Sequence, residues 1–287
     1  MNATNNTIDS NASKHQKNSA TCERVAEALA EVEAGRFTYS VYETPRPVRK
    51  ELSLEEGKVI TNGINADLTN SAVQNITETL SDLKDRLMGA EDNFCLSPGV
   101  THKNGVPIGI TETKKTTYRV DYKSQAEKYD ITVSRSKDHL RRIPGNPSKI
   151  CIDIDEIFNS EEEIFGLLYK IDPQLEHAEM LIVHSSKSML FDGEGNQLYG
   201  PRLHIYCVIS DGGRVKEYLE YLRIRMSDEG LGHIKVSASG GMLVRSVIDE
   251  SVFADERIFF ESPAELGEGL VSKAPEPRII QGGMINV

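Results

Sequence analysis

Two aspartates separated by a single residue are the most chemically suggestive feature of this sequence. Asp153 and Asp155 follow the apolar run 150–152, so in a strand both carboxylates would share one face while the isoleucines enter a core. A third carboxylate, Asp249, ends another apolar stretch. An Asp-x-Asp pair also occurs at solvated strand ends, but the apolar lead-in favours metal binding. We predict that these three aspartates are catalytic and hold Mg²⁺ or Mn²⁺ through carboxylate oxygens.

Basic side chains are expected on the same face as these carboxylates. His204 and Arg202 lie two residues apart in a predicted strand, where a forked Arg contact and a His hydrogen bond would suit a nucleoside triphosphate. Lys235 alternates with apolar residues in another strand, and Arg245 would share a face with Asp249. A lone strand histidine is more often structural, and that interpretation of His204 stays open. We predict that these four basic residues contact the nucleotide.

The most basic run of the chain lies at 134–142. It is either a solvated loop or a surface facing the phosphates of a nucleic-acid template, and the second interpretation gives four candidate template contacts: Arg135, Lys137, Arg141 and Arg142. The net charge of −11 argues against a general nucleic-acid coat, which would carry a basic surface. It permits an enzyme with a local basic groove, because metal ions mask carboxylates.

The elements that must position these residues follow Pro147. Strands are predicted over 149–155, 180–185, 203–209, 233–237, 243–249 and 257–261, and helices over 160–171 and 215–226. Ser160 with Glu163 three residues later is a capping box, which begins a helix. This order of elements describes an α+β fold, with a mainly antiparallel sheet and helices on one of its faces. The other face would be open and polar.

Three segments divide the chain. Residues 1–48 are expected to form a flexible tail and an accessory helix, 49–266 a catalytic domain, and 267–287 a linker or tail toward a missing C-terminal region. Within the domain, apolar residues over 73–87 recur at helical spacing and predict an amphipathic helix. The composition, 38% hydrophobic and 27% charged, is that of an ordinary globular protein.

Several function classes are excluded by absent signals. No apolar run approaches the roughly 20 residues of a membrane span, and the first residues do not resemble a signal peptide, so we expect a cytoplasmic protein with no membrane partner. The four cysteines are far apart, which favours reduced structural thiols over a zinc module. No phosphate-binding loop of the ATPase type is present, so a helicase motor would have to come from elsewhere in the same chain or from another one.

Taken in order, these segments resemble the archaeo-eukaryotic primase superfamily, in particular the primase-polymerase modules of phage, plasmid and integrative-element replication proteins. That family shows an apolar strand with Asp-x-Asp/Glu, a Ser-rich stretch before a strand histidine, and a strand ending in Asp. The matching segments here are Asp153 and Asp155; His184-Ser185-Ser186-Lys187-Ser188 followed by Arg202-Leu203-His204; and Val247-Ile248-Asp249. The resemblance covers about residues 50–270.

The resemblance implies an N-terminal αβ unit followed by a unit like an RNA-recognition motif. It also implies DNA primase and DNA polymerase activity: nucleotidyl transfer from NTPs or dNTPs on a single-stranded DNA template, with a replicative helicase as partner. The three aspartates would be the metal ligands and His204 would contact the nucleotide. Many relatives place Ser two residues before that histidine, where this chain has Arg202, so Ser186 or Ser188 would supply the hydroxyl.

Two other classes of function stay open at this point. A metal-dependent nuclease that nicks DNA would need paired histidines on one strand and a nucleophilic tyrosine, whereas this strand offers His204 and Tyr206 without a second histidine. A non-catalytic module would keep the fold and bind single-stranded nucleic acid or a partner protein.

Overall fold

The computed structural model describes residues 35–44, 47–64, 72–89, 94–103, 106–107, 119–120, 129–130, 136–156, 158–237 and 239–287. These residues form a mixed α+β structure with three α-helices and several small, mostly antiparallel sheets. The accessory helix expected before residue 35 lies outside this description. Among the helices described, none is long and apolar enough to cross a membrane.

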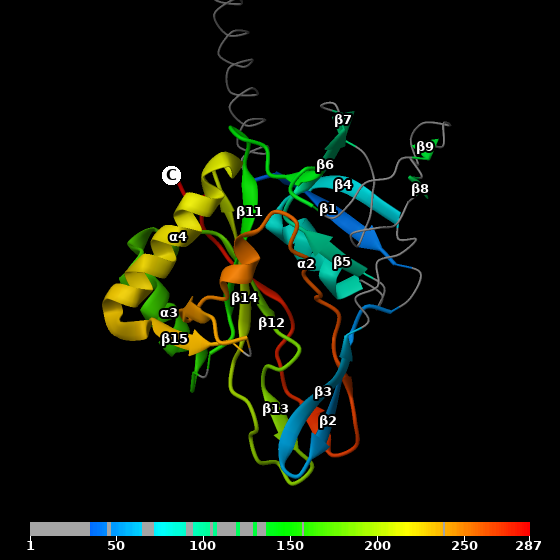
Figure 1. Ribbon diagram of the computed structural model, residues 1–287, viewed down its shortest axis with the longest axis vertical. Coiled ribbons are helices and arrows are strands. Elements are labelled where there is room, and N and C mark those ends of the chain that lie inside the picture. The colour runs from blue at the N-terminus through cyan, green and yellow to red at the C-terminus, as the bar shows by residue number, and fades with distance from the viewer. Residues whose placement is uncertain are drawn as a thin grey trace, which may run out of the picture.

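A four-stranded antiparallel sheet forms the centre of the molecule (Figure 1). Its strands lie in the order β11 (Ser148–Ile154), β14 (Leu203–Ile209), β12 (Met180–His184) and β19 (Arg278–Ile280). At the free edge of β11, Ile248 makes a single antiparallel bridge to Ile154. The first three strands were predicted within two residues, because each is a short apolar run rich in β-branched side chains.

Two helices cover one face of this sheet, as predicted. They are α3 (Glu161–Ile171) and α4 (Val215–Met226), and they lie together on one side of the sheet in Figure 1. Ser160 caps α3 by accepting a hydrogen bond from the backbone N–H of Glu163, whose carboxylate in turn accepts from Asn159. Their apolar stripes bury Ile164, Leu168 and Leu219 in the main core.

The opposite face of the sheet is not open, contrary to our expectation. A second antiparallel sheet of β4 (Ala72–Glu78), β1 (Phe37–Glu43) and β5 (Phe94–Ser97) covers part of it, together with α2 (Leu80–Gly89) (Figure 1). Tyr39 of β1 is fully buried there, and Phe259 belongs to the same core. The sequence pattern missed this layer because alternating polar side chains can face a second sheet as well as water.

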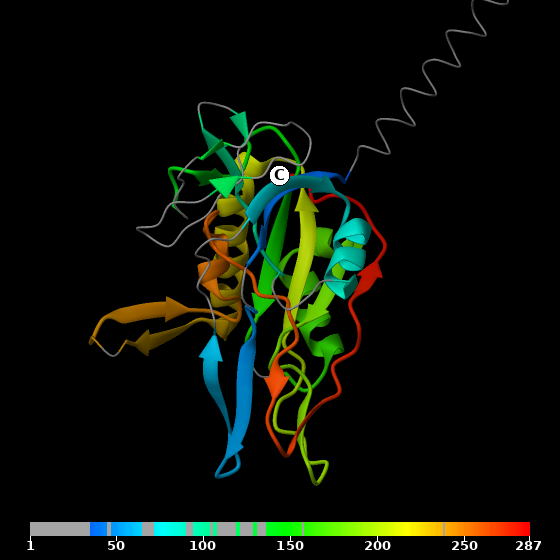
Figure 2. The same ribbon diagram turned by 90° about the vertical axis from the view of Figure 1, so that its right-hand side faces the viewer.

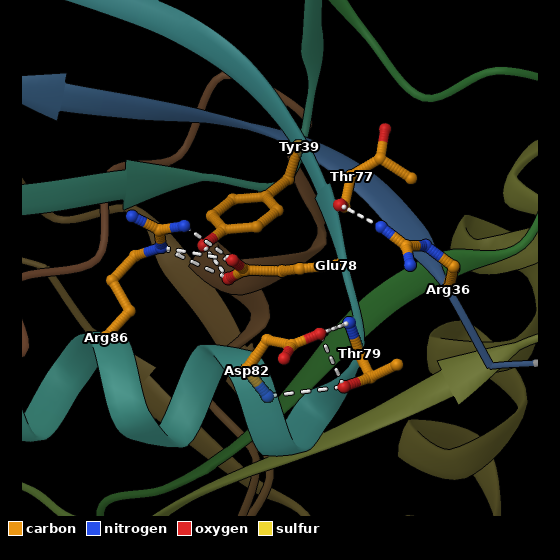
Figure 3. Close-up of polar contacts among 7 residues, drawn as sticks. All are labelled: Arg36, Tyr39, Thr77, Glu78, Thr79, Asp82 and Arg86. Atoms are coloured by element: carbon orange, nitrogen blue, oxygen red, sulfur yellow. Dashed lines mark hydrogen bonds and ion pairs between the residues drawn. The ribbon is translucent and has the colours of Figure 1, made fainter.

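The predicted helix over 73–87 is wrong in its first half, which is strand β4. Val73, Ile76 and Thr77 favour an extended chain. Thr79 then caps the start of α2 (Figure 3). The Thr79 hydroxyl accepts a hydrogen bond from the backbone N–H of Asp82, and the Asp82 carboxylate accepts one from the backbone N–H of Thr79. The buried carboxylate of Glu78 is held by Arg86 and by the Tyr39 hydroxyl, at 2.6 Å each. This contact joins the second sheet to α2.

The segment 267–287 is not a linker. It contributes β18 (Leu270–Ser272) and β19, the latter pairing with β12 at the edge of the central sheet. Beyond β19, Ile285 is buried and the backbone N–H of Ser210 donates to its carbonyl. Prolines and charged residues made this segment resemble a linker, but the apolar residues between them complete the core.

Small strand pairs surround the two layers. A hairpin of β2 (Lys50–Glu55) and β3 (Lys58–Ile64) projects from the body beside β13 (Leu190–Asp192) and β18 (Figure 1). A second two-stranded ribbon, β15 (His233–Val236) with β16 (Met242–Arg245), projects separately (Figure 2). The remaining short elements are β6 (Val100–Lys103), β7 (Val106–Pro107), β8 (Arg119–Val120), β9 (Tyr129–Asp130), β10 (Leu140–Arg141), β17 (Glu265–Leu266), η1 (Pro173–His177), η2 (Gly212–Arg214), η3 (Ser227–Leu231) and η4 (Glu250–Phe253).

The predicted strand 243–249 is divided in the structure. Its first part is β16, which ends at Arg245, and Asp249 stands at the start of the short helix η4. Asp249 accepts hydrogen bonds from the backbone N–H and the hydroxyl of Ser251, which is why the chain turns there.

Candidate functional site

Asp153 and His204 are direct partners in the register of β11 and β14. Directly opposed residues of an antiparallel pair point to the same face, so both side chains lie on the face away from α3 and α4. His204 Nε2 lies 3.6 Å from Asp153 Oδ1, and both side chains are almost wholly buried. The shared polar face predicted for these two residues is therefore present at this end of the sheet.

The other two aspartates lie next to Asp153. Asp155 follows the end of β11 and is exposed, while the backbone N–H of Asp249 donates to the carbonyl of Asp153 at 3.0 Å. Burial raises the pKa of Asp153, and the charges of Asp155, Asp249 and Glu261 raise it further, although His204 opposes them. One imidazole, already shared with Glu261, does not neutralise this group of carboxylates.

The three aspartates fit a hard divalent cation in ligand type and in charge. Their mutual repulsion at Asp153 is the electrostatic condition that a bound cation would relieve. Two of them now pair with arginines: Asp155 with Arg202 at 3.1 Å, and Asp249 with Arg245 at 3.9 Å. Within the described ranges, no three His, Cys, Asp or Glu side chains already surround one point as metal ligands would. Binding a cation would thus require these arginine pairs to rearrange.

Glu261 binds the ring nitrogen of His204 that does not face Asp153. Its carboxylate, 2% exposed, accepts from His204 Nδ1 at 2.8 Å and from the Tyr206 hydroxyl. Burial alone would lower the pKa of His204, but the charges of Glu261 and Asp153 outweigh it and raise that pKa to about 9. Burial raises the pKa of Glu261, and His204 with Tyr206 more than reverses that effect. The imidazole is therefore held between two carboxylates.

A buried lysine lies on the same face, deeper between the two sheets. Lys149 Nζ is 5.0 Å from the ring centroid of Tyr39, 5.1 Å from that of Tyr206 and 5.2 Å from that of Phe259. Among the described residues the ammonium has no hydrogen-bond partner, and the side chain is 1% exposed. Burial lowers the pKa of Lys149 to about 7, although Cys151, Glu261 and Glu78 oppose this effect, and the three aromatic faces add cation–π contacts in the charged form.

Three cations adjoin the carboxylates. Arg202, which pairs with Asp155, also stacks over the Tyr199 ring at 4.7 Å. Burial lowers the pKa of Lys187, and the nearby charges of Lys50 and Arg202 lower it further, so Lys187 lies within electrostatic reach of both. We call Lys50, Lys187 and Arg202 the cation cluster. Their repulsion would be relieved by an anion with several charges.

The two candidate serines differ in what they do. The Ser188 hydroxyl accepts from the backbone N–H of Arg202 at 2.9 Å and bonds to His184 Nδ1 at 2.8 Å, so it serves to hold the turn before β14. The Ser186 hydroxyl is buried and has no partner among the described residues. Ser186 and Glu261 both line a cavity of about 330 Å³, in the size range of small-molecule sites. Of the two, Ser186 is the hydroxyl with unused bonding capacity.

Lys235 is not on the polar face, contrary to our expectation. It lies on β15, which pairs only with β16 among the described strands, and its side chain is exposed on the projecting ribbon. Arg245 ends β16 and reaches the site only through its contact with Asp249. The alternation of apolar and basic residues in β15 predicted the strand correctly but carried no information on which sheet it joins.

The predicted template contacts that the structure describes differ in their exposure to solvent. Arg142 is buried, and its guanidinium pairs with the Asp255 carboxylate and donates to the Phe253 carbonyl. The prediction that Arg142 contacts the template is therefore wrong, because this side chain has a structural role. Lys137 and Arg141 are exposed, and the Arg141 side chain donates to the Lys137 carbonyl at 2.7 Å. Arg135 lies outside the described residues.

Three residues of this site were not among the predicted ones: Glu261, Lys50 and Lys187. Glu261 follows two phenylalanines, and that apolar context was the available sign of a buried carboxylate. Lys187 lies inside the Ser-rich stretch, where its charge was a usable signal. Lys50 comes from β2, far away in sequence, and no local pattern links it to the rest.

The described cysteines, Cys95, Cys151 and Cys207, are buried free thiols, as predicted. Comparison with protein-family models, with curated proteins and with solved structures gives no match for this chain. The geometry of the site is therefore the basis for the proposal that follows.

Proposed function

We propose that this protein is a template-directed nucleotidyltransferase, a primase-polymerase that extends or initiates strands on single-stranded DNA from NTPs or dNTPs. One observation carries the proposal: the cation cluster of Lys50, Lys187 and Arg202 meets the group of aspartates at Asp155, which pairs with Arg202 at 3.1 Å and whose charge acts on Asp153. A nucleoside triphosphate with its divalent cation has the complementary charges, because the phosphates need cations and the metal needs carboxylates.

In this function the cation cluster would bind the triphosphate and orient its α-phosphorus for in-line attack. The 3′-oxygen of the growing strand forms a bond to that phosphorus, the bond to the β-phosphate oxygen breaks, pyrophosphate leaves, and the hydroxyl proton passes to solvent. Asp153, Asp155 and Asp249 would hold Mg²⁺ or Mn²⁺, which when bound favours ionisation of the attacking hydroxyl and neutralises the leaving group. His204, fixed by Glu261, would donate to a phosphate oxygen.

The strand order supports the same proposal. Residue 248, β11, β14 and β12 lie side by side in that order, and α3 and α4 follow β11 and β14 in the chain. A βαββαβ unit of the RNA-recognition-motif type has this order; here its last strand is represented by the single bridge at residue 248, and β19 is added at the far edge. The primase resemblance of the sequence implies such a unit after an N-terminal αβ unit, a role that β1, β4, β5 and α2 would fill.

The nicking-nuclease alternative is less well supported. A nucleophilic tyrosine must reach a phosphodiester, whereas Tyr206 is fully buried and its hydroxyl donates to Glu261. Burial raises the pKa of Tyr206 well above its usual value, which further weakens it as a nucleophile.

The test is synthesis of labelled product on single-stranded DNA with Mg²⁺ or Mn²⁺. Asp153→Asn should lower the rate at least ~100-fold, because metal-ion stabilisation of the transition state contributes several kcal/mol, while Asp228→Asn, which changes an exposed aspartate elsewhere, should retain it. A readout besides activity is Mn²⁺ binding by calorimetry, which Asp153→Asn should weaken. Full activity of Asp153→Asn would contradict the proposal. Metal-insensitive DNA binding without synthesis in the wild type would instead support a non-catalytic binding module.

A further inference from the structure

The ribbon of β15 and β16 has two chemically distinct faces. Its register pairs Ile234 with Val244 and Val236 with Met242, so these four side chains share one face. They are between 52% and 76% exposed, although each is large and apolar. No other described strand pairs with the ribbon, which projects from the body in Figure 2. A contiguous apolar face of this kind on a soluble protein marks an interaction surface.

The opposite face of the ribbon is basic. His233 pairs with Arg245 and Lys235 with Leu243, which places these side chains together on that face. The sequence from 230 to 248 contains no Asp or Glu, although the whole chain has a net charge of −11. This local excess of positive charge selects an anionic partner and disfavours a second copy of the same ribbon, because like charges would face each other.

The ribbon begins at the proposed active site. Arg245 at the end of β16 lies 3.9 Å from Asp249, so a ligand that covers the ribbon continues toward the carboxylates. A free nucleotide or phosphate would use the basic residues and leave the apolar face uncovered. A nucleic-acid duplex satisfies both faces. A two-stranded ribbon fits a groove and its apolar side chains contact sugars and base edges, while the long basic side chains of the opposite face extend past the ribbon to the flanking phosphates.

On these grounds we propose that the β15–β16 ribbon is a nucleic-acid-binding arm that lies in a groove of the primer–template duplex next to the active site. The inference rests on the proposed function for the identity of the duplex. It assigns the apolar residues Ile234, Val236, Met242 and Val244 to direct contact with the groove, and Lys235 to a phosphate.

The test uses the full chain, a fluorescently labelled primer–template duplex and anisotropy in EDTA, so that no synthesis occurs. Replacing Ile234, Val236, Met242 and Val244 together by threonine keeps the strand propensity and should raise Kd about tenfold, equivalent to about 1.4 kcal/mol. The matched control is Val271→Thr, an apolar residue 46% exposed on β18, which should leave Kd unchanged. Lys235→Gln should reduce the slope of log Kd against log salt by about one phosphate contact.

An unchanged Kd for the quadruple variant, with circular dichroism and thermal unfolding like the wild type, overturns the inference. So does an unchanged Kd accompanied by a change in sedimentation from dimer to monomer, because the apolar face would then cover a second copy. The two proposals can fail separately. If the wild type makes no product with any metal but the quadruple variant loses duplex binding, the polymerase proposal is removed and the nucleic-acid-binding arm remains.

Discussion

His204 binds Glu261 through Nδ1 at 2.8 Å and faces Asp153 through Nε2 at 3.6 Å. One imidazole therefore connects the Asp153 carboxylate of the proposed active site to the more deeply buried carboxylate of Glu261. Because Glu261 is 2% exposed and is also held by the Tyr206 hydroxyl, it fixes the orientation of the His204 ring. Glu261 is a positioning residue whose effect on the site acts through His204.

Glu261→Gln should test that connection. The amide cannot stabilise the imidazolium, so the pKa of His204 should fall from about 9 toward its usual value. In the wild type, the stability contributed by the raised pKa of His204 is fully present below pH 6.5 and is lost as the pH rises through about 9. The variant should therefore be less stable by about 3 kcal/mol at pH 6, with a smaller difference at pH 9. Urea unfolding at both pH values and ¹⁵N NMR of His204 measure the two effects; a His204 pKa equal to that of the wild type would refute the assignment.

Lys149→Met should give the opposite pH dependence. The pKa of Lys149 is lowered to about 7 from 10.5, so the unfolded chain binds more protons than the folded one between these values. The cost of burying the ammonium is full at or below about pH 7 and fades toward pH 10.5. Met fills the same space without a charge, so it should stabilise the protein at pH 6, by at most about 5 kcal/mol, and by less at pH 10. A difference in unfolding free energy that does not depend on pH would show that the lysine is not titrating in this range.

The cation cluster predicts an effect on nucleotide binding. Lys187→Met should raise the KM for the nucleotide about tenfold, with a smaller change in kcat, because one charge-assisted phosphate contact contributes about 1.5 kcal/mol. Lys50→Met should act in the same direction. Lys58→Met provides the control, since Lys58 is exposed on the same hairpin. Equal KM values for the Lys58 and Lys187 variants would remove the cluster from the site.

Truncation after Pro277 should destabilise the central sheet. It removes β19 from the edge of β12 and the buried side chain of Ile285. We expect a loss of about 3 kcal/mol, since a fully buried isoleucine contributes about 2 kcal/mol by itself. Ile285→Val, which removes one methylene, should lower the free energy of unfolding by about 1 kcal/mol. It is the reference with which the truncation is compared. Thermal unfolding measures both, and a truncated protein as stable as the full chain would mean that the segment is dispensable.

The sequence predicted best the features that depend on neighbouring residues. The strands containing Asp153 and His204 and the capped helix after Ser160 follow from alternation and capping, which act over a few residues. That Asp153 and His204 lie on the same face was predicted only on the condition that their strands belong to one sheet. Alternation gives the face of a side chain, and the sheet that a strand joins depends on distant contacts.

That limit explains the misplaced residues. Lys235 has the expected alternation, but within the described part of the chain its strand pairs only with β16. Arg142 lies in a basic run, yet the distant Asp255 neutralises it and allows its burial. The segment 267–287 contains linker-like prolines, and only its pairing with β12 and the burial of Ile285 distinguish it from a linker.

The aromatic enclosure of Lys149 also constrains how the chain can be made. Its three walls come from Tyr39, Tyr206 and Phe259, which leave the ribosome at very different times. Until Phe259 emerges, the Lys149 ammonium has only part of its enclosure and stays hydrated. The two sheets can close completely around Lys149 only when that water is removed. Closure of the two sheets should therefore follow the synthesis of Phe259 and be sensitive to pH near 7.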